Sequence, residues 1–164
     1  MNKLLLVIIS GMLVFGYVSC AKSTPNVPAC TNTDPVGDSA TLIHYASQYL
    51  SLSRDSLSRD SLGLFWHIVD SGNTTRPGAN SQLTVTYVAK LMTNQVFDSA
   101  ANSNLGGGYL YQLIPGWQLG LPQIGVGGRI QLLIPSALAW GCNGVTGVAP
   151  DSCVFFDVTL LGVN

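Results

Sequence analysis

The chain has 164 residues, of which 47% are hydrophobic and only 9% charged, and its seven Lys and Arg against eight Asp and Glu give a net charge of −1. This balance leaves no basic stripe, so neither a phosphate backbone nor an anionic membrane surface is an obvious electrostatic partner, and we expect no nucleic-acid binding. The length suits one domain with a real core, preceded by a leader.

The chain begins with the features of a secretory signal. Lys3 precedes an apolar run, LLLVIISGMLVFGYV, that is short for a membrane span of ~20 residues. The run leads into Val18-Ser19-Cys20, which resembles the lipobox of bacterial lipoproteins, although Tyr17 is unusual there. We expect a signal peptide over 1–19, lipid attachment at Cys20 and a place in the cell envelope, periplasmic or at the outer membrane. The alternative is an ordinary cleaved signal with a free Cys20.

Residues 20–62 are predicted to form a tether that contains one short helix. The stretch AKSTPNVPACTNTDPVGD favours turns and solvated chain. A helix is expected to begin near Asp38 or Ser39, because the apolar residues that follow recur at helical spacing. The pentapeptide SLSRD then occurs at 51–55 and again at 56–60. A spacing of five fits neither a helix face nor a strand face, which favours a duplication in a linker.

From Leu64 onward, short alternating runs are divided by Gly, Pro and Asn, a pattern typical of an antiparallel sheet. The strands are predicted at 64–69, 82–91, 95–97, 109–113, 128–134 and 154–162. One short helix is predicted at 116–124, opening at Pro115 and Gly116 and closed by Gly125. The predicted fold class is α+β: a twisted antiparallel sheet of five to six strands with one helix across it, preceded by an N-terminal helix, the domain spanning 63–164.

Export would carry the cysteines to an oxidising compartment. Cys142 and Cys153 flank the loop GCNGVTGVAPDSC and are candidates for a disulfide that closes it, which would leave Cys30 over. Other pairings stay open, because connectivity cannot be read from sequence.

Conventional catalytic motifs are missing. His44 and His67 lack further ligands at metal spacing, and neither a GxSxG elbow nor a Walker sequence occurs, so we expect no metal and no cofactor. The chain is instead rich in aromatic residues beside turns: Tyr87, Phe97, Tyr109, Trp117, Trp140 and Phe156.

Five fragments in order carry a family resemblance: VTYVAKL at 85–91, VFDSA at 96–100, LIPGWQLGLPQIGVGGRIQLLIP at 113–135, ALAWG at 137–141 and VAPDSCVFFDVTLLGV at 148–163. In this order and spacing they resemble the FKBP family of peptidyl-prolyl isomerases, from about Leu64 to the end of the chain. With the leader, the chain is similar to the FKBP-type lipoproteins of Gram-negative bacteria. The resemblance implies an FKBP-like sheet and a monomer that isomerises X–Pro bonds in proline-containing segments of exported proteins, anchored to the membrane by its N-terminal lipid.

The resemblance also implies roles for individual residues. Trp117 would form the floor of a prolyl pocket, with Tyr87, Phe97 and Phe156 as its walls. Leu113, Ile114 and Val148 would form the rim, the Ile114 N–H binding a substrate carbonyl. Asp98 would orient the bound peptide, and Tyr109 falls near a further aromatic wall position.

The chain departs from the family pattern at several positions. Trp140 stands where tyrosine is usual, and indole can only donate a hydrogen bond whereas phenol can also accept one. ANSN after the FDS motif lacks the common basic residue, Gln112 replaces an acidic residue, and Gly147 stands where a branched residue is usual. A non-catalytic FKBP-like module that binds peptides as a chaperone or adaptor is therefore the alternative, and a part in an envelope complex is a third.

Overall fold

The computed structural model describes residues 37–164, so the predicted signal peptide, Cys20 and Cys30 lie outside the described residues. Two helices and six strands follow one another in this order: α1 (Ser39–Tyr49), β1 (Ser58–Arg59), β2 (Phe65–Asp70), β3 (Leu83–Leu91), β4 (Val96–Ser103), α2 (Pro115–Gly120), β5 (Arg129–Ile134) and β6 (Val154–Val163). Short 3-10 turns join several of them. Among the described residues, no helix is long and apolar enough to cross a membrane.

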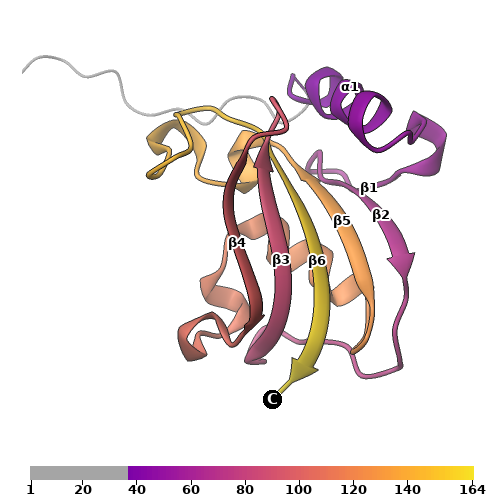
Figure 1. Cartoon of the computed structure of the whole chain (residues 1–164), viewed down its shortest axis with the longest axis vertical. Coiled ribbons are helices and arrows are strands. Elements are labelled where there is room, and N and C mark those ends of the chain that lie inside the picture. Colours follow the sequence, from indigo (N-terminus) through magenta and orange to yellow (C-terminus); the bar gives the residue numbers. More distant parts are fainter. Residues whose placement is uncertain (1–36) are drawn as a thin grey trace, which may run out of the picture.

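All six strands form one antiparallel sheet in the order β1-β2-β5-β6-β3-β4 (Figure 1). The predicted alternation is confirmed in the central strands. Leu83, Val85 and Ala89 of β3 are buried on one face, as are Ile130 and Leu132 of β5. These side chains and α2 enclose the main core. The predicted α+β architecture, with one short helix across the sheet and an N-terminal helix before it, is therefore confirmed.

A second, smaller core lies where α1 packs against the sheet. Leu42 and Tyr45 of α1 are buried there against Phe65, Leu133 and Phe155 of the strands. Successive residues of a strand point to opposite faces, so Phe155 joins this cluster while its neighbour in β6 joins the main core. The sheet thus buries apolar side chains on both faces, and α1 is part of the packed fold.

The structure corrects the predicted tether. Residues 39–62 do not run free: the second SLSRD copy supplies β1, which pairs with β2 through Ser58 opposite Trp66 and Arg59 opposite Phe65. The Arg59 guanidinium also lies over the Phe65 ring, 5.2 Å from its centroid. Tertiary pairing, which the five-residue spacing does not reveal, orders this segment.

Two strand predictions also need correction. The segment 109–113 is not a strand, because Leu110–Gln112 forms a 3-10 turn in which Gln112 Oε1 accepts a hydrogen bond from the Tyr109 N–H. The strand expected at 95–97 continues to Ser103, because its polar residues pair with β3 at the edge of the sheet.

Candidate functional site

A cavity of about 150 Å³ opens on the face of the sheet that α2 covers. Strands β3, β4 and β6, helix α2 and the loops beside them supply its lining: Tyr87, Asp98, Leu105, Leu113, Ile114, Trp117, Trp140 and Phe156. Six of these eight side chains are apolar or aromatic rings without a charge or hydroxyl, so the cavity offers a bound group mainly hydrophobic surface.

Phe156 lies at the centre of the ring cluster. Its ring meets Trp117 edge to face, with centroids 5.3 Å apart and planes at 88°, and meets Phe97 in the same way at 6.0 Å and 88°. The Tyr87 ring lies 5.4 Å from Trp117 at 84°, and Trp140 lies 5.9 Å from Phe97 at 81°. Edge-to-face pairs of this kind are favourable because the positive ring edge meets a negative face. The rings therefore converge on one place, and each holds its neighbours in position.

The Pro115-Gly116-Trp117 sequence places one of the two indole rings of this cluster. Pro115 occupies the first turn of α2, where its missing N–H has no partner to lose. Gly116 is buried, and a Cβ there would lie 2.6 Å from Ile134 Cγ2 of β5. The glycine thus lets α2 lie directly on the sheet, which leaves Trp117 only 4% exposed beneath the cavity.

One hydrogen bond between side chains crosses the cavity wall. The Tyr87 hydroxyl donates to Asp98 Oδ2 at 2.7 Å. Burial, followed by this hydrogen bond and the charge of Asp98, raises the pKa of Tyr87 to about 12. The phenol therefore stays protonated at neutral pH, and the exposed Asp98 carboxylate keeps its other oxygen available to a ligand.

The remaining predicted wall and rim residues occupy different places. Leu113 and Ile114 line the cavity, and the Ile114 N–H donates to no partner within residues 37–164. Phe97 lies behind the lining, against Trp140 and Phe156. Val148 is 4% exposed and belongs to the main core. The rim therefore has one free backbone donor.

Tyr109 lies away from the cavity lining. Its ring is 40% exposed and stacks on Tyr111, with centroids 5.7 Å apart and planes at 10°. Leu105 takes a place in the wall that the sequence analysis did not assign. The only signal for Leu105 is that it is the single large apolar residue in ANSNLGGG.

The predicted disulfide between Cys142 and Cys153 is wrong. Cys153 is a free, buried thiol directly before β6, and Cys142 is disulfide-bonded to another partner. Cys153 is 7% exposed and belongs to the small core under α1. Burial, then the charge of Asp38 and its hydrogen bond, raises the pKa of the Cys153 thiol to about 12.

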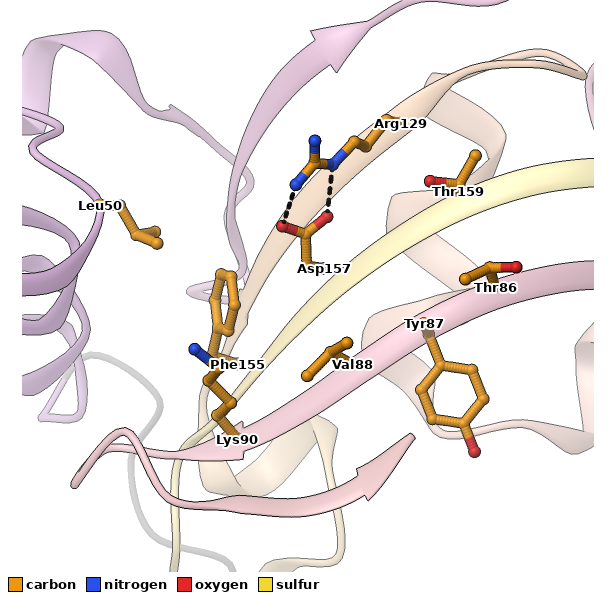
Figure 2. Close-up of a pocket in the computed structure, with 9 residues that line it drawn as sticks. All are labelled: Leu50, Thr86, Tyr87, Val88, Lys90, Arg129, Phe155, Asp157 and Thr159. Atoms are coloured by element: carbon orange, nitrogen blue, oxygen red, sulfur yellow. Dashed lines mark hydrogen bonds and ion pairs between the residues drawn. The ribbon is translucent and has the colours of Figure 1, made fainter. Parts of the chain in front are cut away.

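A larger hollow of about 400 Å³ lies on the opposite face of the sheet (Figure 2). Figure 2 shows the Tyr87 ring directed away from Thr86 and Val88, its neighbours on β3, so the strand separates the two cavities. Arg129 forms a bidentate ion pair with Asp157 here, both bonds at 2.8 Å. This hollow lacks the converging rings of the smaller cavity, which is the better candidate for an apolar ligand.

Comparisons with known proteins agree with this fold. The family profile described as FKBP-type peptidyl-prolyl cis-trans isomerase matches residues 73–161. The FKBP-type peptidyl-prolyl cis-trans isomerase FkpA of Escherichia coli K12 is 38% identical over 105 residues, which are 63% of this chain and 39% of FkpA. The crystal structure of FkpA superposes with a TM-score of 0.64 at 33% identity, covering 80% of this chain and 61% of that one.

Two further relatives share the same region. FK506-binding protein 1 of Saccharomyces cerevisiae is 37% identical over 97 residues, 55% of this chain and 82% of the yeast protein. Outer membrane protein MIP of Legionella longbeachae is 31% identical over 104 residues, 62% of this chain and 45% of MIP. The chain thus spans less than half the length of FkpA and MIP.

Proposed function

Because this chain belongs to the FKBP-type peptidyl-prolyl cis-trans isomerase family, with the family profile matching residues 73–161, we propose that it catalyses cis–trans isomerisation of X–Pro bonds. The observation that carries the proposal is the convergence of Tyr87, Trp117, Trp140 and Phe156 on one apolar cavity. The proline ring of a peptide would enter this cavity and lie against Trp117.

The chemistry needs neither a nucleophile nor a base. Rotation about a peptide bond meets a barrier of ~18–20 kcal/mol because the planar bond has resonance, and X–Pro bonds therefore isomerise in tens to hundreds of seconds. Resonance puts negative charge on oxygen and positive charge on nitrogen, and the twisted transition state loses this separation. An apolar cavity that excludes water penalises the planar amide more than the twisted one.

The polar groups at the rim would then hold the peptide while the bond rotates. The free N–H of Ile114 would donate to a substrate carbonyl, and the oxygen of Asp98 not bonded to Tyr87 would accept from a substrate N–H. Both groups sit on a fixed frame, since Asp98 is held by Tyr87 and Ile114 precedes α2. Fixed donors and acceptors bind with less loss of entropy than mobile ones.

The substrates we propose are exported proteins, with the isomerase anchored in the envelope through lipid at Cys20. This proposal rests on the leader, with its apolar run and Val18-Ser19-Cys20, and on the relative described as an outer membrane protein. Metabolic labelling with a radioactive fatty acid tests it. Labelling of the full chain that is lost in Cys20→Ser is expected, and a Cys20→Ser protein that is still labelled would refute the anchor.

A second candidate function is peptide binding without catalysis. The observation that favours it is Trp140, whose indole lies in the cavity wall where a phenol is usual. A protease-coupled assay on a short proline peptide separates the two functions. Acceleration by the purified chain, competed by excess proline peptide, supports the isomerase. Retained peptide binding without acceleration supports the second candidate.

A further inference from the structure

The carboxylate of Asp38 joins the start of α1 to the chain that leads into the cavity wall. Its Oδ2 accepts two hydrogen bonds from Ser136, one from the backbone N–H and one from the hydroxyl, each at 2.8 Å. Ser136 is fully buried and Asp38 is half-buried, so these bonds are partly shielded from water. Hydrogen bonds to an ionised acceptor are roughly twice as strong as neutral ones. The contact therefore ties together two segments that lie 98 positions apart.

The Asp38 side chain makes this contact and does not cap α1. Asp38 occupies the N-cap position of α1, yet its side chain makes no capping hydrogen bond. Aspartate is among the strongest N-cap residues because its oxygen normally accepts from the first backbone N–H groups of the helix. Here the carboxylate faces Ser136 instead, so its main bonds hold the helix to the domain.

Ser136 is the point at which the wall loop begins. It opens the 3-10 turn Ser136–Leu138, and Trp140 follows two residues later. Beyond Trp140, three glycines at 141, 144 and 147 adopt positive φ. The backbone hydrogen bonds within this loop are local, such as Asp151 N–H to Gly141 O at 2.9 Å, and the disulfide of Cys142 is a further point at which the loop is held. A loop of this kind takes its place from the points at which it is held.

We propose that Asp38 is a positioning residue for the prolyl site: by holding Ser136, it fixes where Trp140 stands in the cavity wall. The inference rests on the proposed function and extends the site to a residue outside 73–161, the part matched by the family profile. Without Asp38 the start of the loop loses these two hydrogen bonds, so Trp140 is less preorganised against Phe97. Planar and twisted peptide then lose binding alike, which raises KM and leaves kcat nearly unchanged.

The test compares three variants of the full chain. Asp38→Ala removes the acceptor, and Asp38→Asn keeps an oxygen that can accept from Ser136. The matched control, Tyr45→Phe, also alters α1 but removes only the 3.1 Å hydrogen bond to Asn94 in the β3–β4 turn. Two readouts are taken: KM and kcat on a proline peptide, and the indole N–H signal of Trp140 in an NMR spectrum, assigned by its loss in Trp140→Tyr.

Asp38→Ala is expected to shift or broaden the Trp140 signal and to raise KM about tenfold, with kcat changed less than about twofold. Asp38→Asn is expected to restore most of both. Tyr45→Phe is expected to lower the melting temperature and leave Trp140 and KM as they are. If Asp38→Ala and Tyr45→Phe lower the melting temperature alike and neither moves Trp140 or KM, the proposal is overturned.

Ser136→Ala covers the case in which Asp38→Ala does not fold, because it removes only the hydroxyl donor. A Trp140 signal that is shifted or broadened relative to wild type supports the proposal, and an unmoved signal overturns it. The NMR readout needs no turnover. A wild-type chain that fails to isomerise the peptide would refute the proposed function, while the Trp140 signal would still decide the role of Asp38.

Discussion

The Tyr87 hydroxyl and Asp98 Oδ2, 2.7 Å apart, join β3 to β4 at the edge of the cavity. Burial, with help from this bond, raises the pKa of Tyr87 from 10.0 to about 12. A raised pKa means that folding favours the protonated phenol. Its contribution to stability is complete below pH 10 and is lost as pH rises through about 12.

We therefore expect the free energy of unfolding to fall between pH 10 and about 12. Tyr45 and Cys153, whose pKa values are also raised to about 12 by burial, contribute to the same loss. Tyr87→Phe should remove part of the decline and keep the part that comes from Tyr45 and Cys153. Urea unfolding at a series of alkaline pH values measures this, and a decline identical in wild type and Tyr87→Phe would contradict it.

Phe97→Ala is expected to lower kcat/KM by roughly tenfold or more, because each ~1.4 kcal/mol lost in the transition state is a factor of ten. The Phe97 ring supports both Trp140 and Phe156 from behind, and its loss frees both walls. Val96→Ala is the matched control, since the Val96 side chain, next to Phe97 on β4, is 51% exposed. Equal activities of the two variants in the protease-coupled assay would count against the assigned wall.

Trp140→Tyr is expected to keep or raise activity. Tyrosine restores a phenol that can donate and accept, and it is smaller than the indole in the cavity wall. Trp140→Phe, which has a ring but no polar atom, separates the effect of size from that of the hydroxyl. A Trp140→Tyr variant that binds peptide normally but has lost turnover would show that the indole itself is required.

Gly116→Ala is expected to destabilise the fold by about 1–3 kcal/mol, the usual cost of overpacking a core. The added methyl group would press on Ile134, which is fully buried and cannot move aside into solvent. Gly78→Ala is the control, because a Cβ there meets nothing within 4 Å. Urea unfolding of the two variants measures the difference. Equal stabilities would mean that α2 does not lie on the sheet as closely as described.

Cys153 is expected to resist alkylation by iodoacetamide in the folded chain. Burial raises the pKa of its thiol to about 12, so little of the reactive thiolate is present at neutral pH. Mass spectrometry of the peptide that contains Cys153 follows the reaction, and denatured protein gives the reference rate. Labelling as fast in the native chain as in the denatured one would contradict the burial of this thiol.

The sequence predicted correctly those elements in which the spacing of hydrophobic residues matches the repeat of the strand or helix that forms. Alternation in β3 and β5 fixes which side chains face the core, and Pro115 marks the start of α2. The segment 109–113 misled because Tyr109, Tyr111 and Leu113 alternate like a strand. Their backbone instead turns at Leu110, whose N–H donates to Ser81 O at 2.9 Å. Such long-range bonds leave no trace in local spacing.

Only part of the candidate site could be predicted from the sequence, because local patterns do not report contacts between distant segments. The order of fragments pointed to the rings and to Ile114, since those positions lie in continuous motifs. Leu105 lies in a polar stretch without periodicity, and Asp38 looked like an ordinary helix cap. Their places depend on how distant segments meet, as the Asp38–Ser136 contact illustrates.

The packing of α1 also decides how short a fragment of this chain can be and still fold on its own. The family profile begins at residue 73 and would invite truncation there or at the predicted boundary of 63. Either cut would remove Leu42 and Tyr45, which pack against Leu133 and Phe155. The apolar surface of the sheet that they cover would then be exposed to water. A fragment that starts at or before Asp38 keeps this apolar surface covered, whereas one that starts after Tyr45 exposes it and should aggregate.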